Sequence, residues 1–107
     1  MALTREFRRS VTARMQRDRI FRKALLVEGV QALLDGDVES GKTVLRQYIR
    51  ATGGFERLGR EAGISAKSLL HMFGKSGDPA MVKLVEVLLC LEARDKIRLR
   101  VRGIQRR

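Results

Sequence analysis

The sequence predicts an all-α fold, a bundle of short helices. Apolar residues recur at three- and four-residue spacing from near the N-terminus to about residue 94. Glycine, aspartate and serine, which end or cap helices, interrupt this pattern repeatedly. Only KIRLRVRG, residues 96–103, alternates with the two-residue period of a strand. A length of 107 residues suits one domain with short arms.

Two helices are expected in residues 1–36. Thr4 can cap the first and Asp18 the second, which Gly36 ends. The apolar face of the first helix comprises Phe7, Val11 and Met15. The stripe of the second comprises Ile20, Phe21, Ala24, Leu25, Val27, Leu33 and Leu34.

A third helix is expected from about Val38 to Thr52, where two glycines break it. Short helices follow at 55–63 and 66–74, the second capped by Ser65. Because proline suits the first helical turn, Asp78-Pro79 predicts the start of a last helix that reaches about Arg94. The alternating tail predicts a short strand, which needs a partner strand from a second copy or another protein unless the tail is disordered.

Residues Gly36 to Thr43, GDVESGKT, match the pattern of the phosphate-binding loop of many ATPases. That loop needs a preceding strand, whereas the residues before Gly36 have helical periodicity. Asp37 and Glu39 would also repel a polyphosphate. We therefore interpret the string as a corner between helices, with Asp37 as the cap of the next helix, and expect no nucleotide there.

The positive charge is concentrated at the two ends of the chain. Residues 1–23 hold eight basic and two acidic side chains, and residues 94–107 hold seven and one, so each end carries +6. The body between them is close to neutral, and the whole chain carries +11. Such ends attract a polyanion, and nucleic acid is the partner that this distribution favours. We divide the chain into a basic helical arm (1–36), a central domain (37–95) and a basic tail (96–107).

The segment FERLGREAGISAKSLLHMF, residues 55–73, is typical of a helix-turn-helix. Gly59 provides the small residue that a crossing helix requires, and Gly63 provides the turn. Core contacts are expected from Leu58, Ala62, Ile64, Leu69 and Met72. The prediction is therefore a helical bundle of the lambda-repressor-like, helix-turn-helix type.

The second helix of such a unit enters the major groove of DNA. Its exposed candidates for reading bases or binding phosphate are Ser65, Ala66, Lys67, Ser68, Leu70 and His71. Candidates for backbone phosphates, which position the protein without specifying sequence, are Arg57, Arg60 and Lys75. A solvated surface explains these last three equally well.

The helix at 79–94 is apolar on nearly every face, which predicts burial on every face. One face can cover the helix-turn-helix. The other can be covered by the N-terminal helices or by a two-fold mate, and the pattern does not distinguish these. A homodimer would present two recognition helices to one stretch of DNA.

Several classes of function lack support in the sequence. His71 is the only histidine and Cys90 the only cysteine, so no histidine pair or intrachain disulfide can form. No nucleophile arrangement or metal cluster is recognisable, which predicts neither an enzyme nor a cofactor. No apolar run reaches the length of a membrane span, and a cytoplasmic protein is expected.

The whole chain, over about residues 3–102, resembles the HigA-like antitoxins, helix-turn-helix proteins also termed addiction-module antidotes. The resemblance rests on RDRIFRKALL, on LLDGDVESGKTVLRQYIRATGGFERL and on KSLLHMFGKSGDP. It implies a dimeric repressor of its own operon, with a small basic ribonuclease-type toxin as partner. Lys67 and Ser68 match the family's recognition helix. Where the family has His-Arg this chain has Leu70-His71, and Asp78 replaces the usual asparagine.

Two functions remain open. The first is a non-enzymatic, sequence-specific DNA-binding repressor, an antitoxin by resemblance. The second is a protein-interaction module whose helix-turn-helix no longer binds DNA, which the missing arginine and the neutral body favour. The toxin-binding surface would lie on the basic arm or on the tail.

Overall fold

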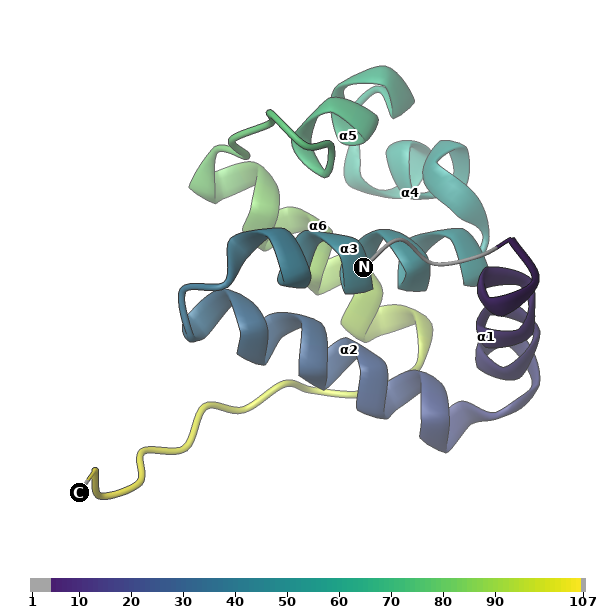
Figure 1. The fold of residues 1–107 in the computed structure, drawn as a ribbon. Helices are drawn as coiled ribbons and strands as arrows, with labels where there is room; N and C mark the ends of the chain where they lie inside the picture. The colour runs from purple at the N-terminus through teal and green to yellow at the C-terminus, as the bar shows by residue number, and fades with distance from the viewer. Residues whose placement is uncertain (1–4, 107) are drawn as a thin grey trace.

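A computed structural model describes residues 5–106 and shows an all-helical protein (Figure 1). The helices are α1 (Arg5–Arg17), α2 (Arg19–Leu34), α3 (Val38–Ala51), α4 (Gly54–Ala62), α5 (Ala66–Met72) and α6 (Met81–Arg94). Helices α2 and α3 form a hairpin that carries α1 at one end, while α4 and α5 lie together on the other side of α3. The predicted fold class is thus confirmed at the level of an all-α bundle.

All six helices contribute to one core. Each provides at least one side chain that is fully or almost fully buried, so α1 and α2 are packed onto the rest of the chain. The largest fully buried side chains are Tyr48, Phe73, Met15, Leu26, Leu45, Ile49, Leu58, Leu69, Leu91 and Val87.

Three predicted helix caps are confirmed. The side chains of Asp18, Asp37 and Ser65 accept hydrogen bonds from the backbone N–H groups three residues further on, at 3.0–3.2 Å. Thr4, the predicted cap of the first helix, lies outside the described residues. Capping is a local interaction, which explains why the sequence alone located these helix starts.

The predicted start of the last helix is wrong by two residues. Helix α6 begins at Met81, and its N-cap is Ala80 in an extended conformation, so Asp78 caps no helix. The carbonyl of Gly77 is bound by Lys42 of α3 at 3.0 Å. The chain is therefore held against α3 just before Asp78, and residues 78–80 are used to cross to α6.

The predicted inward face of α2 needs correction. Ile20 is 83% exposed, and Ala24 is exposed too, whereas Leu26, absent from the predicted stripe, is fully buried. Arg22 occupies the core-facing position one turn before Leu26, because its charge is compensated by Asp95 at 2.7 Å. A search for apolar residues alone assigns the wrong face when a paired arginine lies on the buried one.

The tail forms no strand among residues 97–106. Ile97 and Leu99 are half-buried against the core, and the tail then runs along α2 with its arginines exposed. The alternating pattern predicted a strand, but the described part of this chain contains no other strand that could pair with it.

Helix α6 is not buried on every face. Val87 and Leu91 lie in the core, whereas Met81, Val82, Val85 and Leu89 are 47–80% exposed. The N-terminal helices do not cover this apolar face, so the predicted burial of α6 beneath them is wrong.

Candidate nucleic-acid interface

The turn between α4 and α5 holds these two short helices at close range. A Cβ atom at Gly59 would lie 2.5 Å from the carbonyl oxygen of Ile64, so any side chain there would displace the turn. Gly63 ends α4 with φ of 71°, in the left-handed region that glycine adopts without strain. The predicted core contacts, Leu58, Ala62, Ile64, Leu69 and Met72, are all buried or half-buried. The steric requirement is confirmed at Gly59 only. At Gly63 an added Cβ would meet no atom within 4 Å, and the positive φ alone favours glycine there.

Helix α5 exposes most of the residues that the sequence singled out. Ser65, Lys67, Leu70 and His71 are exposed, while Ala66 and Ser68 are half-buried. Lys67 forms no ion pair with the described residues, so its ammonium group is available to an anion. The Ser65 hydroxyl caps α5 and donates to Ser68 Oγ at 2.9 Å, which occupies part of the hydrogen-bonding capacity of both serines. Lys67, Leu70 and His71 thus form the open part of the face.

Two cations of α3 hold the C-terminal end of α5. Lys42 is almost fully buried, and its Nζ donates to the carbonyls of Gly74 at 2.6 Å and Gly77 at 3.0 Å. Arg46, one turn later, donates to the carbonyl of Phe73. The last carbonyls of a helix lack partners within it and carry partial negative charge, so Arg46, which bonds the C-cap carbonyl of Phe73, stabilises α5 directly. Lys42 bonds the loop that follows and thereby holds the end of α5 against α3.

The string GDVESGKT therefore has a structural role. It forms the α2–α3 corner, with Gly36 at φ of 86°, and helices lie on both sides of it as predicted. Besides its carbonyl contacts, the Lys42 ammonium lies 3.2 Å from a carboxylate oxygen of Glu39. The Thr43 hydroxyl donates to the Glu39 carbonyl at 2.9 Å. The groups that would bind phosphate in a nucleotide-binding loop are engaged within the protein.

Sequence reasoning did not identify the roles of Lys42 and Arg46, although a signal was present. Both lie at helical spacing with Leu45 and Ile49, on the buried face of α3. A lysine within an apolar stripe must find acceptors for its protons, because burying an unpaired charge is very costly. The identity of those acceptors, more than 25 residues away, could not be read from the spacing.

The three predicted phosphate contacts differ in their surroundings. Arg60 and Lys75 are exposed and form no ion pair with the described residues. Arg57 is exposed as well, but its Nε lies 3.2 Å from Glu61 one turn later. Its positive charge is therefore partly compensated, and Arg60 and Lys75 are the stronger candidates.

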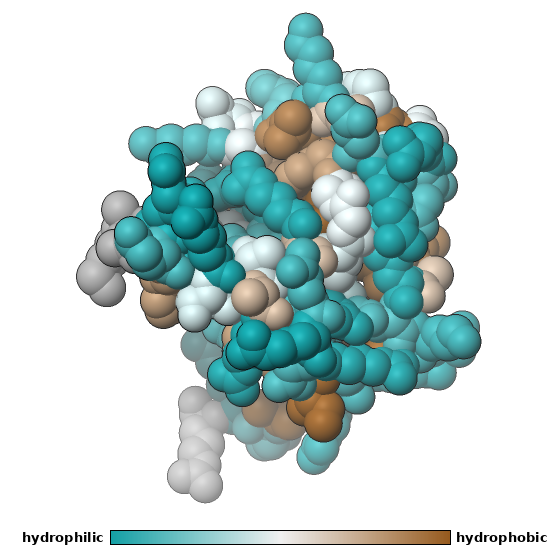
Figure 2. All heavy atoms as spheres, turned by 90° about the vertical axis from the view of Figure 1, so that its right-hand side faces the viewer, coloured by the Kyte–Doolittle hydropathy of each residue, from teal (hydrophilic) through white to brown (hydrophobic). Residues whose placement is uncertain are grey.

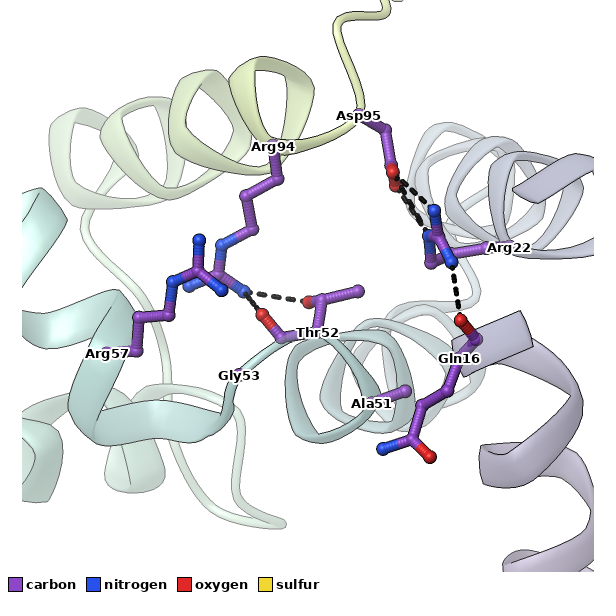
Figure 3. Close-up of a pocket in the computed structure, with 8 residues that line it drawn as sticks. All are labelled: Gln16, Arg22, Ala51, Thr52, Gly53, Arg57, Arg94 and Asp95. Carbon is purple, nitrogen blue, oxygen red and sulfur yellow. Dashed lines mark hydrogen bonds and ion pairs between the residues drawn. The ribbon is translucent and has the colours of Figure 1, made fainter. Parts of the chain in front are cut away.

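Arg94 of α6 is bonded to Thr52, which caps α3, and to Glu61 of α4, and Figure 3 shows its bonds to Thr52. Its side chain is 5% exposed and donates to the carbonyl of Thr52 at 2.6 Å and to Glu61 at 2.9 Å. The hydrogen bond from Arg94, more than any other contact, lowers the pKa of Glu61. The buried Nε of Arg94 has no hydrogen-bond partner among the described residues. These bonds fix α4 relative to the bundle, because Thr52 precedes its first residue and Glu61 lies in its last turn.

Asp95 fixes α1 and α2 in the same way. Arg22 donates to both of its carboxylate oxygens at 2.7–3.1 Å, and Tyr48 donates to one of them from the core. Arg22 also donates to the carbonyl of Met15 in α1 at 2.6 Å. The hydrogen bonds from Arg22 hold the pKa of Asp95 below its ordinary value, and burial raises that of Tyr48. The N-terminal helices are thus attached through a network of buried charges.

Neither a metal cluster nor a membrane span is evident in the described part of the chain. Within residues 5–106, no three His, Cys, Asp or Glu side chains lie close enough together to hold a metal ion. None of the helices described for this range combines the length and apolar character that crossing a bilayer requires.

Comparison with known proteins gives no further identification. No protein-family model matches the chain, and searches of curated proteins and of solved structures found no match either. The resemblance to HigA-like antitoxins therefore stays a prediction.

Proposed function

We propose that the protein is a non-enzymatic DNA-binding repressor in which α4 and α5 form a helix-turn-helix. The observation that carries this proposal is the exposed face of α5, with Lys67, Leu70 and His71 open to a partner. The helix is held at its start by the α4–α5 turn and at its end by Lys42 and Arg46. A reading helix must be held rigidly, because base contacts depend on its position in the groove.

The side chains of the face suit DNA chemically. Lys67 can donate to guanine acceptors or to phosphate, and Leu70 can contact a thymine methyl group. Arg60 and Lys75 flank α5 and can bind backbone phosphates. The family resemblance extends the proposal to a cytoplasmic antitoxin that represses its own operon and binds a small basic toxin.

A two-fold dimer is part of the proposal. The exposed apolar face of α6 is formed by Met81, Val82, Val85 and Leu89, and adjacent exposed apolar side chains of this kind are typical of interaction sites. A second copy seated on the same face would bury it. Two α5 helices could then occupy major grooves about one DNA turn apart, roughly 34 Å.

An electrophoretic mobility assay with the DNA upstream of the protein's own coding sequence tests this function. We expect a shifted band that survives excess scrambled duplex, because α5 would read sequence as well as bind phosphate. Loss of the band with equal amounts of scrambled competitor would contradict sequence-specific repression.

The second candidate function is a protein-interaction module without DNA binding. The exposed apolar face of α6 and the exposed Leu70 favour it, because both suit a protein partner as well as a duplex. Under this alternative the wild-type chain shows no shift with its upstream DNA at any salt concentration.

A further inference from the structure

The two cationic ends of the chain occupy different places relative to α4 and α5. Helix α1 lies at the end of the bundle where α3 passes into α4, whereas the tail leaves along α2 with α3 between it and the α4–α5 pair (Figure 1). Gln16 of α1 lines the same cavity as Arg57 of α4 (Figure 3). Arg94 is bonded to Glu61 of α4, but residues 97–102 of the tail lie along α2, so the exposed cations beside the proposed DNA-binding unit come from the N-terminal end.

A groove rich in arginine runs between α1 and α3. Its volume is about 420 Å³, and it is lined by Arg5, Arg8, Arg9, Thr12, Ala13, Gln16, Gln47 and Arg50. None of these lining residues is acidic, and the four arginines form no ion pair with the described residues. Figure 2 looks onto this side of the molecule and shows hydrophilic side chains over most of it. Four uncompensated guanidinium groups in one groove favour an anionic ligand.

The groove is built on ordered structure. Gln47 of α3 donates to the Thr12 hydroxyl at 2.5 Å and to the carbonyl of Arg8 at 3.3 Å. Met15, which lies on α1 together with Arg8 and Thr12, is fully buried in the core. The arginines of α1 are thus presented from a fixed helix, at the three- and four-residue spacing that places Arg5, Arg8 and Arg9 on neighbouring surface positions.

The groove is continuous with the start of α4. The Arg50 guanidinium lies over the ring of Phe55, 5.9 Å from its centroid, and Phe55 is in the first turn of α4. In a helix-turn-helix complex the first helix crosses the DNA backbone while the second enters the major groove. A strand that passes the start of α4 would continue into the groove beside Arg50.

We propose that this groove binds backbone phosphates of duplex DNA outside the segment read by α5. The inference rests on the proposed function and adds a second, sequence-independent contact. Arginine suits this role, because its planar guanidinium can donate two hydrogen bonds to one phosphate. The tail, whose net charge of +6 equals that of residues 1–23, makes no phosphate contact when α5 is in the major groove.

Salt titration tests the inference, because each phosphate contact adds about 0.9 to the slope of log K against log salt. The variant Arg8→Gln/Arg9→Gln/Arg50→Gln is compared with Arg98→Gln/Arg100→Gln/Arg102→Gln, which removes the same charge from the tail. The probes are the upstream duplex and a scrambled duplex of equal length, and circular dichroism verifies that both variants fold.

We expect the groove variant to lower the slope by roughly 2.7 per bound protomer, and the tail variant to leave it unchanged. Affinity for both duplexes should fall by the same factor, so that the preference for the upstream sequence is retained. A third variant, Arg8→Lys/Arg9→Lys/Arg50→Lys, keeps the positive charges and should restore most of the slope. This result would show that the glutamine variant binds less salt-dependently because it lost charge, and not because it misfolded.

Two results would overturn the inference while leaving the proposed function intact: equal losses of slope in the groove and tail variants, or no loss in either. Binding of the wild type to vesicles of phosphatidylserine but to neither duplex would make an anionic membrane the partner and refute both proposals. The assays therefore distinguish a protein that binds DNA without the groove from a protein that does not bind DNA.

Discussion

Lys42 and Lys67 are the same residue type in opposite environments. Lys42 is 3% exposed and bound by two carbonyls and a carboxylate, whereas Lys67 is exposed and forms no ion pair with the described residues. Lys42 lies in the string that resembles a phosphate-binding loop, yet its charge is used to hold α5 in place. The partners that a cation already binds within the protein, more than the motif in which it lies, therefore determine whether it can bind a ligand.

The largest effect is expected for Lys42→Met. Removing the ammonium leaves the Gly74 and Gly77 carbonyls without a donor in a buried region, and the free energy of unfolding should fall by about 3 kcal/mol. Urea denaturation of this variant and of Lys23→Met provides the measurement. Lys23 is exposed, so its replacement should change stability by less than about 0.5 kcal/mol. Similar unfolding free energies for the two variants would contradict the stabilising role of the Lys42 hydrogen bonds.

A smaller effect, about 2 kcal/mol at pH 7, is expected for Asp95→Asn, because the amide keeps an acceptor for Arg22 but loses the charge that strengthens these hydrogen bonds. Because the folded pKa of Asp95 is lowered, its carboxylate stabilises the wild type above the unfolded pKa, near 4, and this contribution is lost as pH falls through the folded value. The difference in unfolding free energy between wild type and variant should therefore shrink below about pH 4. A difference that stays constant from pH 7 to pH 2 is incompatible with this network.

Leu89→Glu extends the comparison to exposed apolar groups. Leu89 is 58% exposed in the single chain, so a charge there should change the stability of the folded protomer by less than about 0.5 kcal/mol. In the proposed dimer the same charge would be buried beside its symmetry mate, and dissociation is expected. Sedimentation equilibrium of wild type and variant measures this. A variant that stays dimeric would place the interface elsewhere than on α6.

The sequence predicted what local chemistry determines. The caps at Asp18, Asp37 and Ser65, and the glycines at 59 and 63, act within a few residues, and the structure confirms them. Lys67 and His71, predicted to be exposed on the second helix of the helix-turn-helix pattern, are exposed in the structure. These elements sufficed for the all-α class and for the outline of the candidate interface.

What the sequence did not predict depends on contacts between distant residues. The buried face of α2 was misassigned because Arg22 is compensated by Asp95, 73 residues away. Asp78 was misassigned as a cap because Lys42 holds the chain at Gly77. The arginine groove combines residues 5–9 with Arg50, which only the packing of α1 on α3 brings together. Periodicity indicates which side of a helix is apolar, but it does not indicate which charged residues from distant parts of the chain form ion pairs.

The central claim is that α5 reads DNA, and a matched pair of lysine variants tests it most directly. Fluorescence anisotropy with the upstream duplex compares wild type, Lys67→Ala and Lys23→Ala at one salt concentration. Each variant loses one exposed charge, but only Lys67 lies on α5. We expect Lys67→Ala to bind about 10-fold more weakly, in the range of one lost base contact, with unfolding free energy unchanged and Lys23→Ala close to wild type. Equal binding by all three proteins would contradict the claim.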